Sequence, residues 1–402
     1  MSTFELKRCQ KTSLDPHLSI ATMKTDWKDN TKGSAAMRIQ HTATIRRSDK
    51  TLRNAHVKLL LVALFCVSAF GVFGFSATCF AQDDFYPLPQ RNPSGFGFPY
   101  PPPAPDEPGV TFNRRYILDG NTELDFNPRP QDEVWLISTR GIQDLDKPVT
   151  LDQFVCKHVA GTGWNQVPVQ QLIDVQNGNA GKATVMFLHG NQTTAFWARR
   201  RGKQAYQVLI GNNPNEMPPV RFVIWSWPSD PLPQPLRDFD KKMERSVTDG
   251  LLFAHFLSHL DHRHPLRLIT YSLGTQVAFS GIENVTVQTG SCPPIEMIAM
   301  APVTHCHWPA SPRQLHTTAN QIQSLRFFRN KKDLAIIAYK SFCTVCLRKK
   351  FVPGADVISQ VHPNASQIDV SDDVGREHNV LGYVLQPHVA RTLHAFLHSV
   401  NR

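Results

Sequence analysis

The chain has 402 residues, of which 41% are hydrophobic, and a formal net charge of +10. Residues 1–58 hold 12 of the 43 Lys and Arg residues but only 5 of the 33 Asp and Glu residues, which leaves a nearly balanced 31 against 28 in the remainder. This balance does not suggest binding to nucleic acid. The sequence has no internal repeat, no phosphate-cradling Gly-rich loop and no dinucleotide fingerprint, so we expect no cofactor.

Three segments precede the predicted domain. Residues 1–58 form a basic tail that we expect to be disordered. Residues 59–81 are a hydrophobic run that follows Arg and Lys residues. This pattern predicts either a signal peptide that ends at Ala81 or an N-terminal anchor that spans a bilayer with the positive tail inside. Residues 82–110 are dense in Pro and Gly and are predicted to be an extended spacer.

Both alternatives for residues 59–81 predict export, so we expect the protein to be periplasmic, secreted or associated with the membrane through this segment. The leader is long for a signal peptide unless translation begins near Met37. Residues 111–402 follow the spacer. At about 290 residues, they can bury most of their surface as one α/β domain.

The first predicted strands of this domain are apolar runs. They cover residues 183–188 and 220–228, and the second ends in Pro228, which cannot donate to a strand ladder. The first run leads into His189 and Gly190, and a helical pattern follows through Phe196, Trp197 and Tyr206. Residues 245–260 are predicted to be a helix whose core-facing positions are Val247, Leu251, Ala254 and Leu257.

The next segment is the most informative. An apolar run at residues 266–271 ends at Ser272, and a helical pattern starts at Leu273. A serine on a tight turn between a strand and a helix points its hydroxyl away from the sheet, which is the geometry of a nucleophile. Gly274 fits a position where the start of the helix passes close to the strand, so that a side chain would collide. The usual pattern G-x-S-x-G has a Thr here, Thr270, in place of its first Gly, so an ordinary buried turn serine is the alternative.

The remaining elements repeat the order of strand and helix. Strands are predicted at residues 295–301 and 324–328, and helices at 334–341 and 385–397; the run Q-I-D-V at residues 367–370 and a polar loop lie between the two helices. Such alternation predicts an α/β fold with a mostly parallel, doubly wound sheet and helices on both of its faces.

The chain resembles the α/β-hydrolase superfamily, and more narrowly a bacterial α/β-hydrolase family of unknown function. The resemblance covers residues 130–400 and rests on four motifs: an entry strand at residues 136–140 that ends in Thr139 and Arg140, the His-Gly loop, the sequence S-W-P-S at residues 226–229, and the serine turn. Two positions depart from the family. Residues 189–192 read H-G-N-Q where the family tends to have H-G-Y-N, and Val303 stands where many members carry an acid after Ala-Pro.

The resemblance implies a catalytic triad in the chain order serine, acid, histidine. Ser272 is the predicted nucleophile. Asp333 is the predicted acid, because it follows a strand on the same rim of the sheet, although an N-cap would suit it equally well. His378 is the predicted general base. The rivals that stay open are Asp356, Asp369, Asp372 and Asp373 for the acid, and for the base His362 above all, then His305, His307, His316, His388, His394 and His398.

The resemblance also implies an oxyanion hole of backbone N–H groups, from Leu273 after the serine and from Asn191 or Gln192 in the His-Gly loop. The side chain of His189 is expected to be structural and to bond a nearby carbonyl. Aromatic residues near this rim are expected either to line an acyl pocket or to pack in the core; they are Trp197, Trp225, Trp227 and Trp308.

Five cysteines follow the export segment: Cys156, Cys292, Cys306, Cys343 and Cys346. Their pairing cannot be deduced from the sequence. Cys343 and Cys346 are spaced as C-x-x-C and could form a redox pair or a local disulfide, but packing as small hydrophobic residues is the default expectation. His305, Cys306 and His307 are weak evidence for a metal site because no second cluster has zinc-like spacing, so no metal is expected.

The sequence thus predicts a serine hydrolase that acts on small-molecule or lipid esters: carboxylic esters first, then lipids and thioesters. The alternative is a catalytically inactive binding or envelope-scaffold protein with the same fold, which the missing first Gly and the unusual oxyanion loop keep open. A thiol redox role through Cys343 and Cys346 is a third, weaker hypothesis.

Overall fold

The computed structural model describes residues 126–142, 148–161, 163–178, 181–211, 217–232, 235–304, 318, 321–345 and 365–398. The predictions for residues 1–58, 59–81 and 82–110, and for the start of the domain predicted at 111–402, lie outside these residues. Among the helices that the structure describes, none has both the length and the apolar content needed to cross a membrane.

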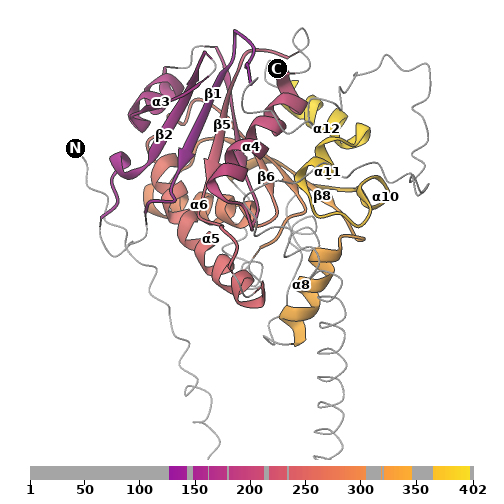
Figure 1. The fold of residues 1–402 in the computed structure, drawn as a ribbon. Helices are drawn as coiled ribbons and strands as arrows, with labels where there is room; N and C mark the ends of the chain where they lie inside the picture. The colour runs from indigo at the N-terminus through magenta and orange to yellow at the C-terminus, as the bar shows by residue number, and fades with distance from the viewer. Residues whose placement is uncertain are drawn as a thin grey trace, which may run out of the picture. The chain divides into compact units, whose positions relative to one another are not determined.

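The described residues form one sheet in the order β3-β2-β1-β5-β4-β6-β7-β8-β9 (Figure 1). Strand β2 runs antiparallel to both neighbours, and all other neighbouring pairs are parallel. The strands are β1 (Glu133–Ser138), β2 (Val155–Ala160), β3 (Gly163–Val167), β4 (Ala183–Leu188), β5 (Val220–Ser226), β6 (Leu266–Tyr271), β7 (Ile295–Met300), β8 (Ile322–Arg329) and β9 (Ala365–Asp369).

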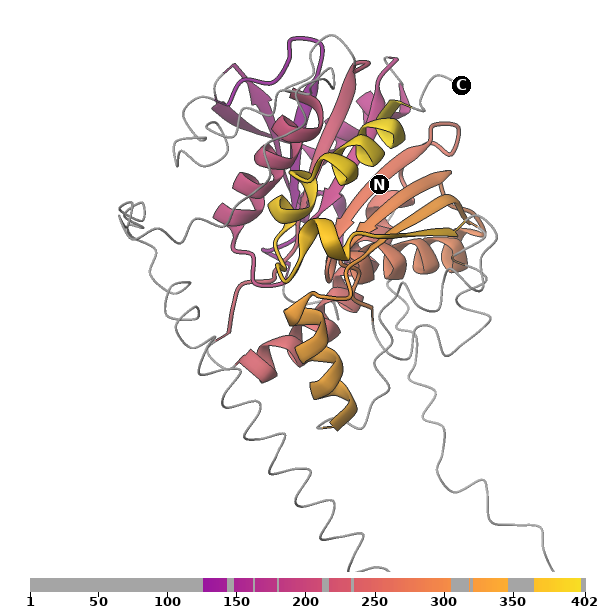
Figure 2. The same cartoon turned by 90° about the vertical axis from the view of Figure 1, so that its right-hand side faces the viewer.

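Helices cover both faces of the sheet (Figures 1 and 2). One core cluster joins the sheet to α3 (Val169–Asn177), α5 (Pro235–Leu257) and α6 (Gly274–Thr289). A second cluster lies on the opposite face. It joins the sheet to α4 (Ala195–Tyr206), the π-helical segment η2 (Gln207–Gly211), α10 (Ser371–Val374), α11 (Val380–Val384) and α12 (Pro387–His398). The chain also contains η1 (Leu151–Gln153) and α8 (Leu334–Val345). The predicted fold class is therefore confirmed.

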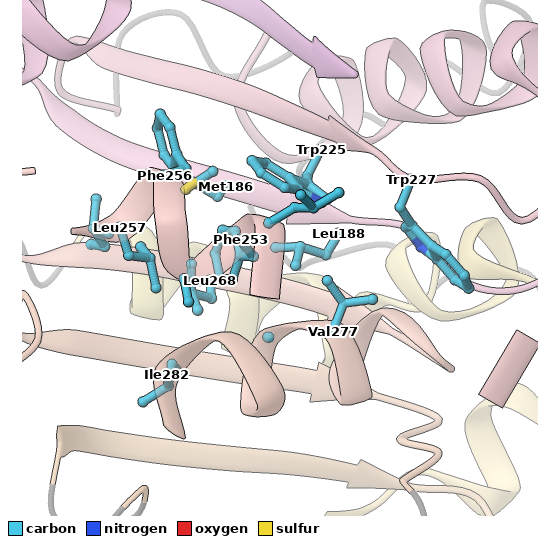
Figure 3. Packing of buried hydrophobic residues seen from close by; sticks show 14 of the residues in the cluster. Met186, Leu188, Trp225, Trp227, Phe253, Phe256, Leu257, Leu268, Val277 and Ile282 are labelled. Atoms are coloured by element: carbon cyan, nitrogen blue, oxygen red, sulfur yellow. The ribbon is translucent and has the colours of Figure 1, made fainter. Parts of the chain in front are cut away.

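The central strands are buried on both faces, as their unbroken apolar runs indicate. Every residue of β5 and β6 is buried. Figure 3 shows how the strand side chains Met186, Leu188 and Trp225 meet the helices of the first cluster. The indole ring of Trp225 packs edge-on against Phe253, with ring centroids 4.9 Å apart, and lies 5.7 Å from Phe256. Full burial of one Leu, Phe or Met side chain in such a cluster contributes about 1.5–3 kcal/mol to the stability of the fold.

The prediction for α5 was wrong at its start and on one of its core positions. The helix begins at Pro235 rather than residue 245, and Val247 is 37% exposed. Its buried face carries Asp249 instead, whose carboxylate accepts hydrogen bonds from the hydroxyl of Thr139 (2.6 Å) and the indole N–H of Trp225 (2.9 Å). Hydrophobic periodicity does not assign a carboxylate to the buried face of a helix. Burial of Asp249 is tolerated only because Thr139 and Trp225 donate hydrogen bonds to it.

Other boundaries also differ from the predictions. The predicted helix at residues 385–397 corresponds to α12, which starts two residues later, at Pro387, and ends at His398, while the short helix α11 before it was not predicted. Pro387 lacks the N–H needed to continue a helix, so it suits the first turn of a new one. Strand β1 lies at 133–138 rather than 136–140, and α8 continues to Val345 rather than ending at residue 341.

The chain reverses direction across the sheet between β4 and β6. These strands are neighbours, yet α4 follows β4 onto one face while α6 follows β6 onto the other. In open parallel sheets, ligands bind at the carboxyl ends of the strands at such a switch point. The segments that leave β4 and β6, which are the His-Gly loop and the serine turn, therefore lie next to each other at this point.

Candidate active site

Ser272 follows β6 in a strained backbone conformation. Its φ angle is +51°, a left-handed value that costs a residue with a side chain about 1–3 kcal/mol. Three backbone hydrogen bonds hold it there. Its N–H donates to the carbonyl of Met300 (3.0 Å), and its carbonyl accepts from the N–H groups of Thr275 (3.0 Å) and Val303 (3.2 Å). The end of β7 thus helps to fix the turn.

Two glycines allow the chain to pass close to this turn. A Cβ on Gly274 would lie 2.4 Å from the carbonyl oxygen of Leu188 and 2.6 Å from that of His189, so the start of α6 touches the end of β4. A Cβ on Gly190 would lie 2.9 Å from the Cβ of Ser272. The His-Gly loop therefore packs directly against the serine.

Thr270, at the position of the first Gly in the usual pattern, is accommodated by a local partner. Its side chain is fully buried, and its hydroxyl lies 3.0 Å from the hydroxyl of Thr275 in the first turn of α6. Because the buried hydroxyl is satisfied, the larger residue fits the turn without an unpaired polar group.

Ser272, His378 and Asp333 form one chain of hydrogen bonds. The Nε2 atom of His378 lies 3.1 Å from the Oγ of Ser272, and its Nδ1 lies 2.7 Å from Oδ2 of Asp333. The side chain of His378 is 20% exposed and that of Asp333 is fully buried. The residues come from the ends of β6 and β8 and from the segment before α11.

The carboxylate of Asp333 has four hydrogen-bonding partners. Oδ1 accepts from the N–H groups of Ala335 (3.0 Å) and Ile336 (3.1 Å), so the residue caps α8 as well as contacting His378. Oδ2 also accepts a longer bond from the hydroxyl of Tyr383 (3.4 Å). Burial, together with the charge of Asp333, raises the pKa of Tyr383, so that hydroxyl stays protonated. The N-cap and the contact with His378 exist together.

The rival acids and bases have other surroundings. Asp369 pairs with Lys331 and Ser371, Asp372 pairs with Lys332, and Asp373 pairs with the exposed His388. His394 and His398 lie in α12. Among the described histidines, His378 alone hydrogen-bonds Ser272. The rivals that lie outside the described residues are Asp356, His305, His307, His316 and His362.

Two of the predicted oxyanion donors, Asn191 and Gln192, directly follow Gly190, which packs against Ser272, and the third, Leu273, directly follows the serine. Gln192 has a φ angle of +51°, which is unusual for a residue with a side chain. Among the backbone hydrogen bonds in the turns and loops of the described chain, none is donated by the N–H group of Leu273, Asn191 or Gln192. Asn191 is anchored through its side chain, whose amide donates to the buried carboxylate of Asp238 on α5 (3.0 Å).

The motifs that carry the family resemblance meet around this loop. Arg140 donates to Oγ of Ser226 (2.9 Å) and to the carbonyl of Thr193 (2.7 Å). The hydroxyl of Ser229 donates to the carbonyls of Gly190 (3.2 Å) and Thr193 (3.0 Å). These residues are far apart in the sequence, and their shared task is to hold the backbone of residues 190–193 in place.

The side chain of His189 lies in the interior. Its Nδ1 is 2.9 Å from the carbonyl oxygen of Gly190, and its ring stacks on Trp227. Burial lowers the pKa of His189 well below its usual range, and the positive charge of Arg140 acts in the same direction. The imidazole is therefore neutral and braces the loop.

The two expectations for the tryptophans were an acyl pocket and packing in the core, and packing is confirmed for two of them. Trp225 and Trp227 are fully buried, and the indole N–H of Trp227 donates to the carbonyl of His189 (2.8 Å). Trp197 is 37% exposed at the start of α4, and Trp308 lies outside the described residues.

Three residues near the serine were not predicted from the sequence: Tyr271, Arg201 and Asp238. Tyr271 directly precedes Ser272, and its ring centroid lies 5.2 Å from that of His378. Asp238 belongs to the part of α5 that precedes the predicted helix. A signal existed only for Tyr271, as the variable residue inside the serine motif.

The described part of the chain contains no group of three His, Cys, Asp or Glu residues suited to a metal ion. Cys156 and Cys292 are buried and unpaired, and burial raises the pKa of each thiol to about 12, so neither is a reactive thiolate. The metal and redox hypotheses for residues 305–307 and for Cys346 concern positions outside the described residues.

The sequence matches no protein-family model and no curated protein. Among solved structures, the chain is similar to the crystal structure of TT1662 from Thermus thermophilus, with 16% sequence identity and a TM-score of 0.31 over 55% of this chain and 90% of that chain. A likeness this weak says nothing about the activity of this chain.

Proposed function

We propose that this protein is a serine hydrolase of the α/β-hydrolase type, which cleaves esters by acyl transfer. The observation that carries the proposal is the continuous chain of hydrogen bonds from Ser272 through His378 to Asp333. It stands at the carboxyl ends of parallel strands, next to the switch point of the sheet. A buried turn serine with a purely structural role has no need of a histidine and a carboxylate aligned in this order.

His378 serves as the general base in this proposal. A carboxylate only accepts hydrogen bonds, so the contact with Asp333 keeps the proton on Nδ1 and turns the lone pair of Nε2 toward the hydroxyl of Ser272. His378 takes the hydroxyl proton as Oγ attacks the ester carbonyl. It returns that proton to the departing alcohol when the carbon–oxygen bond breaks.

Backbone N–H groups stabilise the negative charge on the carbonyl oxygen. Leu273 supplies one donor, and Asn191 or Gln192 supplies the other. In related chemistry, loss of one such donor costs about 2.7–4 kcal/mol of transition-state stabilisation. Water then attacks the acyl-enzyme with His378 again as base, which releases the acid and restores Ser272.

Carboxylic esters are the proposed substrates, with lipid esters and thioesters next. We also propose, on the hydrophobic run at residues 59–81 and the basic residues before it, that the protein is exported or anchored to the membrane. Fractionation of cells that express the full chain tests this: recovery in the cytoplasmic fraction alone would contradict it.

The function is tested with a fluorophosphonate probe, which labels activated serines. The full-length protein is expected to be labelled, and Ser272→Ala is expected to abolish labelling. Ser258→Ala is the matched control, because its hydroxyl lies at the end of α5, where it donates to the carbonyl of His255 and lies 3.3 Å from Nδ1 of His259. Absence of labelling in folded wild-type protein favours the inactive binding or scaffold protein with the same fold.

A further inference from the structure

A guanidinium group without a carboxylate partner lies beside the oxyanion loop. Arg201 stands on α4, and its side chain runs back toward the start of that helix, where Nη1 donates to the hydroxyl of Thr193 (3.1 Å). Its Cζ atom lies 5.6 Å from the ring centroid of Trp197. None of the ion pairs among the described residues includes it. Burial lowers the pKa of Arg201, as expected for a cation withdrawn from water.

A hydroxyl without a partner in the described chain lies against the same loop. Tyr271 is 5% exposed, and its buried phenolic oxygen has no hydrogen-bond partner in the described chain. Its ring touches the position that a Cβ on Gly190 would occupy, 2.9 Å from its Cδ1. A buried hydroxyl left unpaired costs about 1–3 kcal/mol, so such a group calls for an explanation.

The two groups are close enough to influence each other. Burial, together with Tyr383 and the charge of Asp333, raises the pKa of Tyr271 well above its usual range, so its hydroxyl stays protonated and can donate; the positive charge of Arg201 acts in the opposite direction. One group supplies a positive charge and the other an O–H donor, and both flank residues 190–193, which pack against Ser272. A carboxylate accepts hydrogen bonds from both kinds of donor, and Arg matches its planar geometry.

We propose that Arg201 and the hydroxyl of Tyr271 form a subsite that binds a carboxylate of the ester substrate, next to Ser272. This inference rests on the proposed function, because it assigns a substrate class to the same site. The preferred substrates are then esters whose acyl part carries a second, free carboxyl group. Such a ligand would supply the charge that Arg201 lacks and the acceptor that Tyr271 lacks.

The competing explanation is that Arg201 only braces Thr193 and thereby the oxyanion loop. A brace would affect all esters alike, whereas a subsite distinguishes charged from neutral ones. The test therefore compares 4-nitrophenyl butyrate with the mono-4-nitrophenyl ester of succinic acid, which has an acyl chain of the same length and a terminal carboxylate.

Wild-type protein is expected to show a kcat/KM at least 10-fold higher for the succinate ester. Arg201→Gln is expected to lower this value about 10- to 100-fold, the range for loss of a charge-assisted hydrogen bond, and to change the butyrate value less than 3-fold. Arg201→Lys should restore part of the preference, and Tyr271→Phe should weaken it several-fold. Arg199→Gln, on the same helix and with the same change of charge, is the control.

Equal losses on both esters in Arg201→Gln, or no preference in the wild type, would overturn the subsite while leaving the hydrolase intact. Binding of succinate to Ser272→Ala, measured by calorimetry, is independent of turnover. The two proposals can therefore fail separately. If wild-type protein binds no fluorophosphonate, the proposed function fails. The subsite still stands in that case if Ser272→Ala binds succinate and the double variant Ser272→Ala, Arg201→Gln does not. Absence of succinate binding in Ser272→Ala contradicts the subsite.

Discussion

The side-chain amide of Asn191 donates a hydrogen bond to the carboxylate of Asp238, 3.0 Å away and fully buried on α5. The other oxygen of that carboxylate accepts from the N–H of Leu232 in the segment after β5 (2.9 Å). One carboxylate thus ties the oxyanion loop to the neighbouring loop and to a helix of the opposite face. A backbone N–H group stabilises developing negative charge best when it already points at the oxyanion position before the reaction starts, because no free energy is then spent on reorienting it.

Replacement of Asp238 is therefore expected to impair the reaction without removing any reacting group. Asp238→Ala leaves the amide of Asn191 and the N–H of Leu232 without their acceptor, so we expect kcat on a neutral aryl ester to fall about 10- to 100-fold, with KM nearly unchanged. Asp373→Ala, which removes an exposed carboxylate beside His388, is the control. A raised KM with an unaltered kcat would point to substrate contact rather than to positioning.

Asp333 offers a way to separate catalysis from helix capping. Asn caps helices as well as Asp does, so Asp333→Asn should keep α8 capped while it leaves His378 without a charged partner. We expect kcat to fall by about 10⁴ with little change in thermal stability. Asp333→Ala should show the same loss of rate and a further loss of about 0.5–2 kcal/mol in the free energy of unfolding. Equal stability of the two variants would contradict the capping role.

The contact between α6 and β4 predicts a severe effect at Gly274. A Cβ there would lie 2.4 Å from the carbonyl oxygen of Leu188, which is backbone and cannot rotate away. Gly274→Ala is expected to destabilise the protein by about 1–3 kcal/mol or more and to abolish fluorophosphonate labelling. Gly163→Ala has no atom within 4 Å of its added Cβ and should be nearly neutral. Denaturant unfolding compares the two, and a tolerated Gly274→Ala would refute the close approach.

His255 makes stability depend on pH. Burial, reinforced by the nearby His259, lowers the pKa of His255 from 6.5 to about 4. The unfolded chain binds a proton near pH 6.5 and the folded chain only near pH 4, so the unfolded state gains protons first as the pH falls. Stability should be complete above pH 6.5 and decline toward pH 4, by about 3 kcal/mol for this residue. In His255→Gln this part of the decline should vanish in urea unfolding between pH 7.5 and 4.5; an unchanged slope would exclude His255 as its source.

The local features of the site could be predicted because each depends on residues that are near one another in sequence. The strand, serine and helix at residues 266–289 follow from an apolar run, a turn and Gly274, which needs no side chain. The alternation of such units determines a mostly parallel sheet, since parallel strands require crossover helices. The sequence by itself therefore determined the fold class and the rim on which candidate residues stand.

Long-range packing decided the rest. Several acids and histidines follow Ser272, and hydrophobic periodicity cannot rank them. Only the folded chain places His378, 106 residues further on, within 3.1 Å of the serine hydroxyl. The buried partners of Asn191 and Asp249 are equally invisible to a local pattern, because a polar residue can enter the core only where distant groups meet it. The choice among these candidates and the surroundings of each are thus decided by the tertiary structure.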